Sequence, residues 1–163
     1  MTLQPQLGLR SRRKFYTDLA SIDGMIVTDD TGKLKAWIED KIRSTCPNDF
    51  RDCSTLGVAR NGELICGVAY WFYPTGVCDV GIASTSPRWA TKQTIFTLFA
   101  YPFKQVGVNR LQAFIHPKNK RSRRLCEGLG FTMEGKLRKF QRGKDMMVYS
   151  YLKEEFDRSK WCE

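Results

Sequence analysis

Long hydrophobic runs are absent from this chain of 163 residues. A membrane-spanning helix needs about 20 consecutive apolar residues, and no stretch reaches that length. The N-terminal residues also lack the pattern of a signal peptide. These absences argue against a helical membrane protein, and we expect a soluble protein of the cytoplasm.

Metal-binding patterns are equally scarce. Histidine occurs once, at His116, and no two cysteines have the C-x-x-C spacing of a zinc site. The six cysteines are scattered, with Cys66 and Cys78 in apolar segments and Cys126 in a helical one. We interpret most of them as small buried hydrophobic residues and expect no metal site.

Acidic residues are few in one region of the chain. Overall, 27 Lys and Arg face 17 Asp and Glu, which gives a net charge of +10. Ten of the cations lie between residues 118 and 144, where only Glu127 and Glu134 oppose them, so this block carries +8. A block of one sign attracts polyanions. A phosphate-bearing cofactor such as coenzyme A, nucleic acid and an acidic protein are all candidates.

The rest of the composition fits one globular domain. The mass is 18.8 kDa and 42% of the residues are hydrophobic. A chain of this size buries about two-thirds of the surface that its unfolded form exposes. We interpret residues 1–163 as a single domain and expect residues 1–8 and 155–163 to be loose termini.

Hydrophobic periodicity predicts alternating helices and strands. The clearest feature is a hairpin, in which strands at 56–59 and 64–72 flank Asn61-Gly62, a pair typical of a type I′ turn. Ser86 and Pro87 favour the start of a helix that continues to Val106, with a kink at Pro102. In chain order, the other expected elements are a helix around Phe15, Tyr16 and Leu19, a strand at 25–27, a turn at 29–32, a helix at 33–44, strands at 77–83 and 111–115, a helix from Asn119, a strand from Phe131 and a strand at 146–152.

The most informative stretch runs from Asn119 to Gly135 and reads NKRSRRLCEGLGFTMEG. Leu125 and Leu129 repeat at helical spacing, and Gly128 and Gly130 are expected to end the helix before the next strand. Followed by Leu-Arg at 137–138, this stretch resembles the acetyl-CoA-binding half of the GNAT (Gcn5-related) N-acetyltransferases. It is most similar to the branch of the ribosomal-protein N-terminal acetyltransferases, and the likeness covers residues from about 55 to 153.

The resemblance implies a fold and an activity. The fold is the α/β (α+β) GNAT fold, a mixed, mostly antiparallel sheet of six to seven strands with about four helices. The activity is acetyl transfer from acetyl-CoA to a primary amine of a protein N-terminus, a lysine or a small molecule, by a monomer or homodimer with no membrane partner. The segment SPRWAT at 86–91 looks like GNATs of phages and prophages, which would place the protein in a host cytoplasm.

The resemblance also implies a cofactor site. The family's diphosphate pattern, Q/R-x-x-G-x-G/A, falls on 86–91 or on 88–93, and both registers lack its glycines. Cations and a hydroxyl at the start of the helix would compensate, because helix N-termini bind phosphate. The implied cofactor-binding residues are Ile82, Ala83 and Ser84 on a strand, Arg88, Trp89, Ala90, Thr91 and Lys92 before and at the start of one helix, and Asn119, Arg121 and Ser122 on another.

Acyl transfer to an amine needs a neutral amine and a proton for the leaving thiolate. Many GNATs supply that proton from a tyrosine at the position of Cys126, and here we favour Ser122, because a thiol is a poor donor to an equally acidic thiolate. Asp79 is the only acid in its apolar strand, where family members often have a base. Asp79 and Ser122 are therefore the catalytic candidates, and Glu134, His116 and ordered water remain alternative bases.

The missing glycines and the missing tyrosine leave a second hypothesis open. The chain could be an inactive GNAT-fold module that binds nucleic acid or a host protein through residues 118–144. Only Phe131 and Phe140 interleave these cations, and we expect both in the core, which speaks against a platform for stacked bases. Nucleic acid is thus a candidate partner but not the favoured one.

Overall fold

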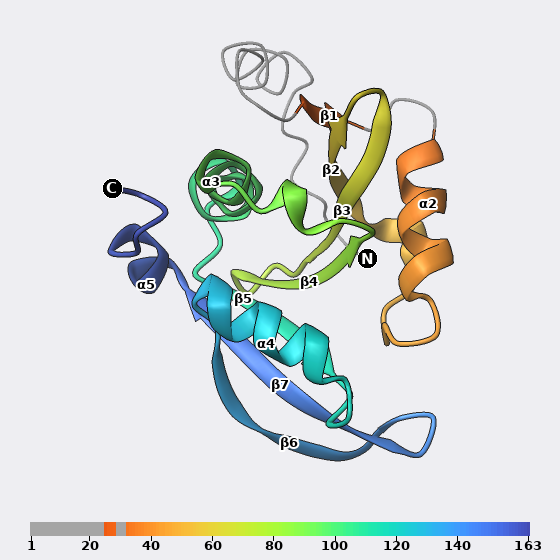
Figure 1. Ribbon diagram of the computed structural model, residues 1–163. Helices are drawn as coiled ribbons and strands as arrows, with labels where there is room; N and C mark the ends of the chain where they lie inside the picture. The colour runs from red at the N-terminus through yellow and green to blue at the C-terminus, as the bar shows by residue number, and fades with distance from the viewer. Residues whose placement is uncertain (1–24, 29–31) are drawn as a thin grey trace.

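Seven strands form one sheet with helices on both faces (Figure 1). The computed structural model describes residues 25–28 and 32–163. The strand order is β1-β2-β3-β4-β5-β7-β6, and only β4 and β5 run parallel. The strands are β1 (Met25–Thr28), β2 (Ser54–Arg60), β3 (Glu63–Phe72), β4 (Val77–Ser84), β5 (Arg110–Ile115), β6 (Thr132–Gln141) and β7 (Lys144–Leu152). The α-helices are α2 (Lys33–Ile42), α3 (Lys92–Ala100), α4 (Lys120–Leu129) and α5 (Lys153–Asp157).

This architecture confirms the predicted fold class within the described residues. The expected helix around Phe15, Tyr16 and Leu19, the loose residues 1–8 and most of the turn at 29–32 lie outside them. None of the helices from α2 to α5 is both long and apolar enough to cross a membrane.

The predicted hairpin is confirmed as β2 and β3. Asn61 has φ 51° and Gly62 has φ 76°, so both turn residues adopt the positive φ angles of a type I′ turn. From there β3 runs through the centre of the sheet, buried along most of its length. The β2–β3 ladder extends from Arg60 and Glu63 at the turn to Ser54 and Tyr70, with one register shift between Val58 and Ala59.

Helix α2 covers one face of the sheet through very close contact with two glycines. A Cβ at Gly67 would lie 2.5 Å from Cγ1 of Ile38, and one at Gly81 would lie 2.9 Å from Cδ1 of Ile42. A larger residue at either glycine would force these isoleucine side chains to shift. Leu34 and Ile38 are buried at this contact, together with Trp71 from β3.

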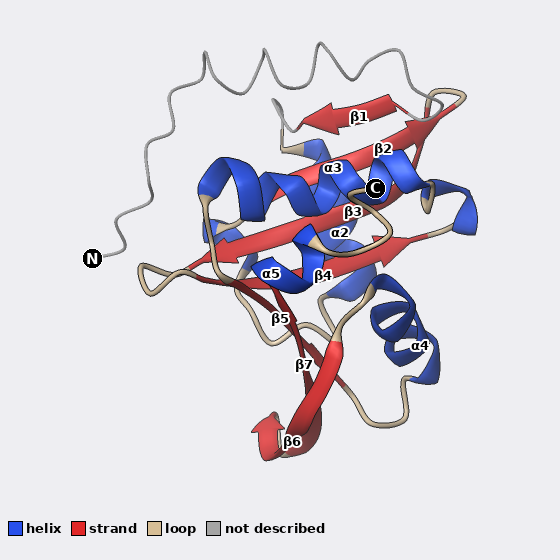
Figure 2. Cartoon of the chain, turned by 90° about the vertical axis from the view of Figure 1, so that its left-hand side faces the viewer, coloured by secondary structure: helices blue, strands red, loops and turns tan. Residues whose placement is uncertain are grey.

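The other face is covered by α3, α4 and α5 around an aromatic core (Figure 2). The C-terminal segment belongs to this core, so the prediction of a loose end at 155–163 is wrong. Phe156 is fully buried, with its ring 5.3 Å from that of Phe103, and the Trp161 indole N–H donates to the Leu129 carbonyl at 2.8 Å. These two aromatic side chains are the reason that a polar-looking tail docks.

The helix predicted at 87–106 is divided into three parts. Ser86 and Pro87 start only a short 3₁₀ turn, Pro87–Trp89, after which Thr91 caps α3 in a capping box with Thr94. At Tyr101 the helix changes to a π-helix, Tyr101–Val106. Proline at position 102 has no N–H for an α-helical bond, and its carbonyl accepts from both Gly107 and Val108. The expected distortion at Pro102 is therefore present as a π-helix.

Candidate functional site

The parallel strands β4 and β5 pair over only three residues each. Val77, Cys78 and Asp79 pair with Arg110, Leu111 and Gln112, and the ladder then ends. Beyond this point β4 continues to Ser84 alongside β3, and β5 continues to Ile115 alongside β7. Two strand edges therefore diverge, and each presents backbone N–H and C=O groups that no described strand pairs.

A pocket of about 610 Å³ opens where these strands separate. We call it the split-strand pocket. It is lined by Val80–Ser84 of β4, by residues 113–116 at the end of β5, by α4, by the end of α2 with the loop after it, and by Pro87, Trp89 and Ala90. Of the predicted cofactor-binding residues, it brings together Ile82, Ala83, Ser84, Trp89, Ala90, Asn119, Arg121 and Ser122.

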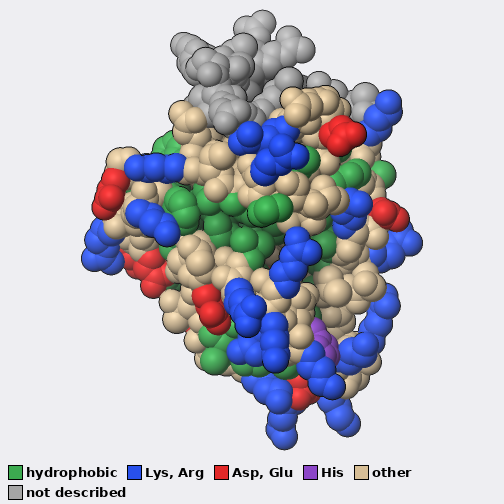
Figure 3. Space-filling view, viewed as in Figure 1, with side chains coloured by type: hydrophobic (Ala, Val, Ile, Leu, Met, Phe, Trp, Pro, Cys, Tyr) green, Lys and Arg blue, Asp and Glu red, His purple; other side chains and the backbone are tan. Residues whose placement is uncertain are grey.

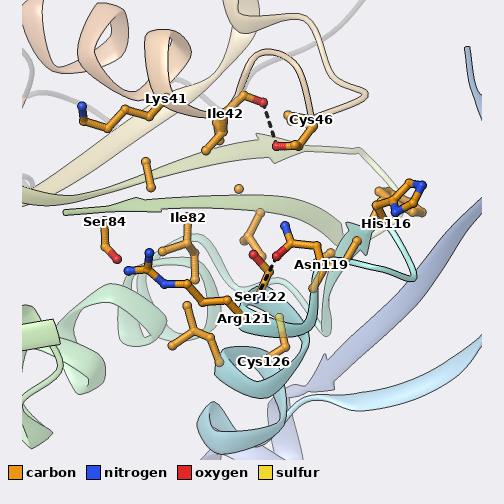
Figure 4. Close-up of a pocket in the computed structure, with 18 of the residues that line it drawn as sticks. Lys41, Ile42, Cys46, Ile82, Ser84, His116, Asn119, Arg121, Ser122 and Cys126 are labelled. Carbon is orange, nitrogen blue, oxygen red and sulfur yellow. Dashed lines mark hydrogen bonds between the residues drawn. The ribbon is translucent and has the colours of Figure 1, made fainter. Parts of the chain in front are cut away.

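The charged side chains that line the split-strand pocket are all basic. They are Lys41 from α2 and Arg121 and Arg124 from α4, and no Asp or Glu is among its described lining residues. The close-up shows the Arg121 guanidinium reaching toward Ser84, with Lys41 on the α2 side (Figure 4). In the space-filling view, Lys and Arg side chains gather below an apolar centre, over α4 (Figure 3). One end of the pocket is therefore suited to an anionic group.

Asn119 starts α4 and positions the next candidate. Its side-chain oxygen accepts from the Ser122 N–H at 3.2 Å, which is an N-cap contact. Ser122 and Cys126, four residues apart, both face the split-strand pocket. Burial raises the pKa of the Cys126 thiol to about 12, so the thiol stays protonated and is a weak acid. The helix ends at Gly130, with φ 114°, whereas Gly128 lies inside it, contrary to expectation.

The predicted diphosphate segment is only partly at the pocket. Trp89 is 2% exposed and packs in the core, and it also contributes to the lining of the pocket. The Thr91 hydroxyl accepts from the Thr94 N–H at 3.2 Å and is occupied as a helix cap. Arg88, Thr91 and Lys92 do not line the pocket, although they adjoin Trp89 and Ala90, which do.

A second pocket of about 500 Å³ adjoins the first on the α2 side of the sheet. We call it the acidic pocket, because its charged residues are Asp49, Asp52 and Asp79, with no Lys, Arg or His among its described lining residues. Pro47, Asn48 and Phe114 line both pockets, so the two cavities share a wall. The other lining residues of the acidic pocket are Trp71, Tyr73, Gln112 and Phe140.

Asp79 lies in the acidic pocket and is 5% exposed. Its Oδ2 accepts from Asn48 Nδ2 at 2.8 Å and from the Tyr73 hydroxyl at 2.9 Å, and its Oδ1 accepts from Gln112 Nε2 at 2.7 Å. Burial and the neighbouring carboxylate raise the pKa of Tyr73 to about 12, so this hydroxyl keeps its proton and donates. Three uncharged donors therefore compensate for the burial of this carboxylate.

The hydrogen-bonded network continues from Asp79 along the sheet. Arg110 Nε donates to Gln112 Oε1 at 3.1 Å, and its two terminal nitrogens bind both oxygens of Glu134 at 2.9 and 2.6 Å. The Ser150 hydroxyl donates to Glu134 at 2.6 Å. The Arg110 guanidinium, with help from Ser150, lowers the pKa of Glu134 to about 2. Glu134 is thus engaged as an ion-pair partner, and it lines neither pocket.

Two residues differ from their expected roles or environment. Phe140 was expected in the core, but it is 44% exposed and stacks on Phe114 with ring centroids 4.8 Å apart. The bulge in β6 between Leu137 and Gln141 places it over the acidic pocket. His116, an alternative base, lines the split-strand pocket, where its Nδ1 accepts from the Lys118 N–H at 3.1 Å.

Sequence reasoning missed several lining residues, of which two carried a usable signal. Gln112 and Phe114 alternate with the apolar residues of β5, so they had to face the opposite side of the sheet. Asn48 and Tyr73 lie in loops, and only the fold brings them to Asp79. Lys41 was counted in the helix, but its position above β4 depends on how α2 packs.

Comparisons with known proteins agree with this geometry. The family model described as an acetyltransferase (GNAT) domain matches residues 27–132. A protein of Bacillus licheniformis named uncharacterized N-acetyltransferase p20 is 28% identical over 108 residues, and the match spans 61% of each chain. This chain thus covers less than two-thirds of that relative.

Solved structures share the fold at low sequence identity. The ribosomal-protein-S5-alanine acetyltransferase of Vibrio fischeri is 15% identical, with a TM-score of 0.62 and coverage of 80% of this chain and 93% of that one. A spermidine N-acetyltransferase mutant from Vibrio cholerae is also 15% identical, with a TM-score of 0.65 and coverage of 82% and 98%. These two likenesses concern the fold alone.

Proposed function

The chain belongs to the GNAT acetyltransferase family, and from this premise we propose that it transfers an acetyl group from acetyl-CoA to a primary amine. The observation that carries the proposal is the separation of β4 and β5 beyond Asp79. It opens a pocket with two strand edges for walls and basic side chains at one end, beside a second pocket of opposite charge.

The residues present fit acetyl-CoA in the split-strand pocket. An extended chain with amide groups can add to a free strand edge through backbone hydrogen bonds, and residues 80–84 of β4 offer such an edge. Lys41, Arg121 and Arg124 supply positive charge for the phosphates. In this proposal, side chains replace the glycine-rich backbone that this chain lacks, while Arg88 and Lys92 add charge outside the pocket.

The proposed chemistry needs proton transfers on two sides of the reacting carbon. Acetyl-CoA supplies an activated acyl group as a thioester, and the amine supplies the electron pair that forms the new C–N bond. Asp79, directly or through water, accepts the proton that the amine releases. Ser122, positioned by the Asn119 cap, donates a hydrogen bond to the leaving thiolate and relays to it a proton from water, while Asp79 passes the proton of the amine to solvent, so the proton count balances.

The acceptor in this proposal is an amine that enters through the acidic pocket. Two structural neighbours are named for acceptors of this kind, spermidine and the alanine of ribosomal protein S5. Pro47, Asn48 and Phe114 form the wall shared by the two pockets, so an amine held beside Asp79 lies next to the point where the strands diverge.

Calorimetry with acetyl-CoA tests the proposal. We expect affinity in the micromolar range that weakens as salt rises, because phosphates would meet the basic residues of the pocket. Ser84→Phe places a ring in the split-strand pocket and should abolish binding, whereas Thr85→Phe changes the exposed neighbour outside both pockets and should not. Dephospho-CoA, which lacks one phosphate, should bind more weakly and with a smaller salt dependence.

The same samples test the inactive-module hypothesis. No heat with acetyl-CoA at millimolar concentration, together with tight binding of duplex DNA or RNA in gel shifts, would replace the proposed function by nucleic-acid binding through residues 118–144. For a genuine nucleic-acid site, the logarithm of the affinity falls steeply with the logarithm of salt concentration. We expect feeble nucleic-acid binding at physiological salt instead.

A further inference from the structure

The charge of the acidic pocket is opposite in sign to the net charge of the whole chain. The chain carries a net charge of +10, yet the charged residues of this cavity are three aspartates. Asp79 is at its buried end, and Asp49 and Asp52 are exposed. Asp49 is engaged by Arg51 at 2.6 Å, which leaves Asp52 and Asp79 as the carboxylates available to a ligand. A cavity with negative charge at two depths favours a cationic guest.

The buried carboxylate still has acceptor capacity for such a guest. A carboxylate offers about four acceptor positions on its two oxygens. Asn48 and Tyr73 use Oδ2, and Gln112 uses Oδ1, so three hydrogen bonds are made. All three donors are neutral, and among the described residues no cation pairs directly with Asp79, although Arg110 interacts with it electrostatically.

Four aromatic side chains, Trp71, Tyr73, Phe114 and Phe140, also line the acidic pocket. Tyr73 is 43% exposed and Phe140 is 44% exposed, which is unusual for large side chains in this protein. Phe140 rests on Phe114, and Trp71 is held by a 2.6 Å hydrogen bond from its indole N–H to the Asp49 carbonyl. Aromatic faces attract ammonium groups and alkyl chains alike, so these walls suit an aliphatic cation.

The chemistry of acetyl transfer then distinguishes between acceptors with one and with two positive charges. An amine must lose its proton before it attacks, and a neutral amine is no longer attracted by the carboxylates. An acceptor with a single amine thus gives up this attraction in the reactive state. A second ammonium group keeps its charge throughout and continues to pair with the aspartates.

We propose that the acidic pocket is an acceptor site selective for small aliphatic amines that carry a second positive charge, the alkyl diamines and polyamines. The role as acceptor site rests on the proposed acetyltransferase function, but the binding of the dication does not. Asp52 and the aromatic walls hold the ammonium that stays charged, while Asp79 faces the amine that reacts. Macromolecular acceptors are the alternative that the experiment separates.

The experiment compares putrescine with n-butylamine, which has the same four-carbon chain and one amino group fewer. Calorimetry on the full chain without acetyl-CoA should show putrescine binding at least about fivefold tighter, from the added ion-pair and cation–π contacts. Asp52→Asn should reduce the preference, and Glu63→Gln, an exposed acid outside both pockets, should leave it unchanged.

The possible outcomes test the dication site independently of the proposed acetyltransferase function. Equal affinity for the two amines, or equal effects of Asp52→Asn and Glu63→Gln, overturns the selectivity for dications. Acetylation of a protein N-terminus without any putrescine binding overturns it as well and leaves acetyl transfer standing. Putrescine binding by a protein that does not bind acetyl-CoA would support the proposed dication site and contradict the proposed acetyltransferase function.

Discussion

The two pockets share a wall but have opposite charges. The split-strand pocket takes its charge from Lys41, Arg121 and Arg124 on two helices. The acidic pocket takes its charge from Asp49 and Asp52 at a short 3₁₀ turn and from Asp79 in β4. The net charge of residues 118–144 therefore predicted a basic site but gave no sign of an acidic one. The charge of a cavity depends on the few side chains that line it and not on the net charge of the surrounding segment.

The difference also separates two tasks of an acetyl transfer. A phosphate-bearing donor and a cationic acceptor attract each other in solution, and each needs its own site if both are to be oriented. The end of the β4–β5 ladder at Asp79 lies at the boundary between these sites. The reaction would take place at this boundary, so changes on either side should affect different measurable quantities.

The largest effect is expected from Asp79→Asn, which removes the proposed base and keeps the shape of the side chain. Turnover on a responsive amine should fall by roughly 10²–10⁴-fold, the usual contribution of general base catalysis, and recover partly as pH rises. Affinity for acetyl-CoA should barely change, because Asp79 does not line the split-strand pocket. Steady-state kinetics and calorimetry measure both quantities.

The stability of this variant needs its own control. An amide in place of the carboxylate turns one of its acceptors into a donor that faces Asn48, Tyr73 or Gln112, at a cost of about 1–3 kcal/mol. A melting curve shows whether the protein is folded at the assay temperature. A folded Asp79→Asn protein with full turnover at neutral pH would make Asp79 structural and leave His116 or water as the base, since Glu134 lines neither pocket.

An intermediate effect is expected from Arg121→Gln. Its guanidinium reaches into the split-strand pocket, so affinity for acetyl-CoA should fall by about three- to tenfold, as for the loss of one partly exposed charge contact. Arg88→Gln is the comparison variant, and a smaller loss is expected from it, because Arg88 is exposed and adds its charge outside the pocket. Putrescine binding should be unchanged in both variants. A larger loss of acetyl-CoA affinity from Arg88→Gln would indicate that the phosphates bind at the segment 86–91 instead.

The smallest effect is expected from Glu134→Gln, at the far end of the network that begins at Asp79. The variant should lose on the order of 1 kcal/mol or less at neutral pH, a figure already discounted because Glu134 is 40% exposed and water screens the ion pair. Urea unfolding followed by tryptophan fluorescence measures it.

The pH dependence of the same measurement identifies the cause. The pKa of Glu134 is lowered from 4.5 to about 2 in the folded protein. The contribution of this group is therefore complete above about pH 4.5 and disappears as pH falls toward 2. Wild type should lose more stability than Glu134→Gln across this window, with Glu63→Gln as a control that behaves like wild type. Parallel curves for wild type and Glu134→Gln would contradict the role of the ion pair.

Local patterns in the sequence determined most of the fold. Asn61-Gly62 predicted the hairpin, and the 119–135 motif predicted a helix followed by a strand, because turn chemistry and periodicity act over a few residues. The limits of the long helix at 87–106 were not predictable in the same way. The burial of Trp89 in the core and the capping box at Thr91 divided it, although Ser86 and Pro87 looked like a better start.

The sequence by itself determined the family, the strand β4 and the basic start of α4, since these depend on residues that are neighbours in the chain. Only the tertiary structure decided that Asn48, Tyr73 and Gln112 donate hydrogen bonds to Asp79. It also decided that Phe140 is exposed and stacks on Phe114. These contacts join residues from separate loops and strands. Their geometry depends on how α2 packs against Gly67 and Gly81 and on where β4 and β5 separate, which no local pattern encodes.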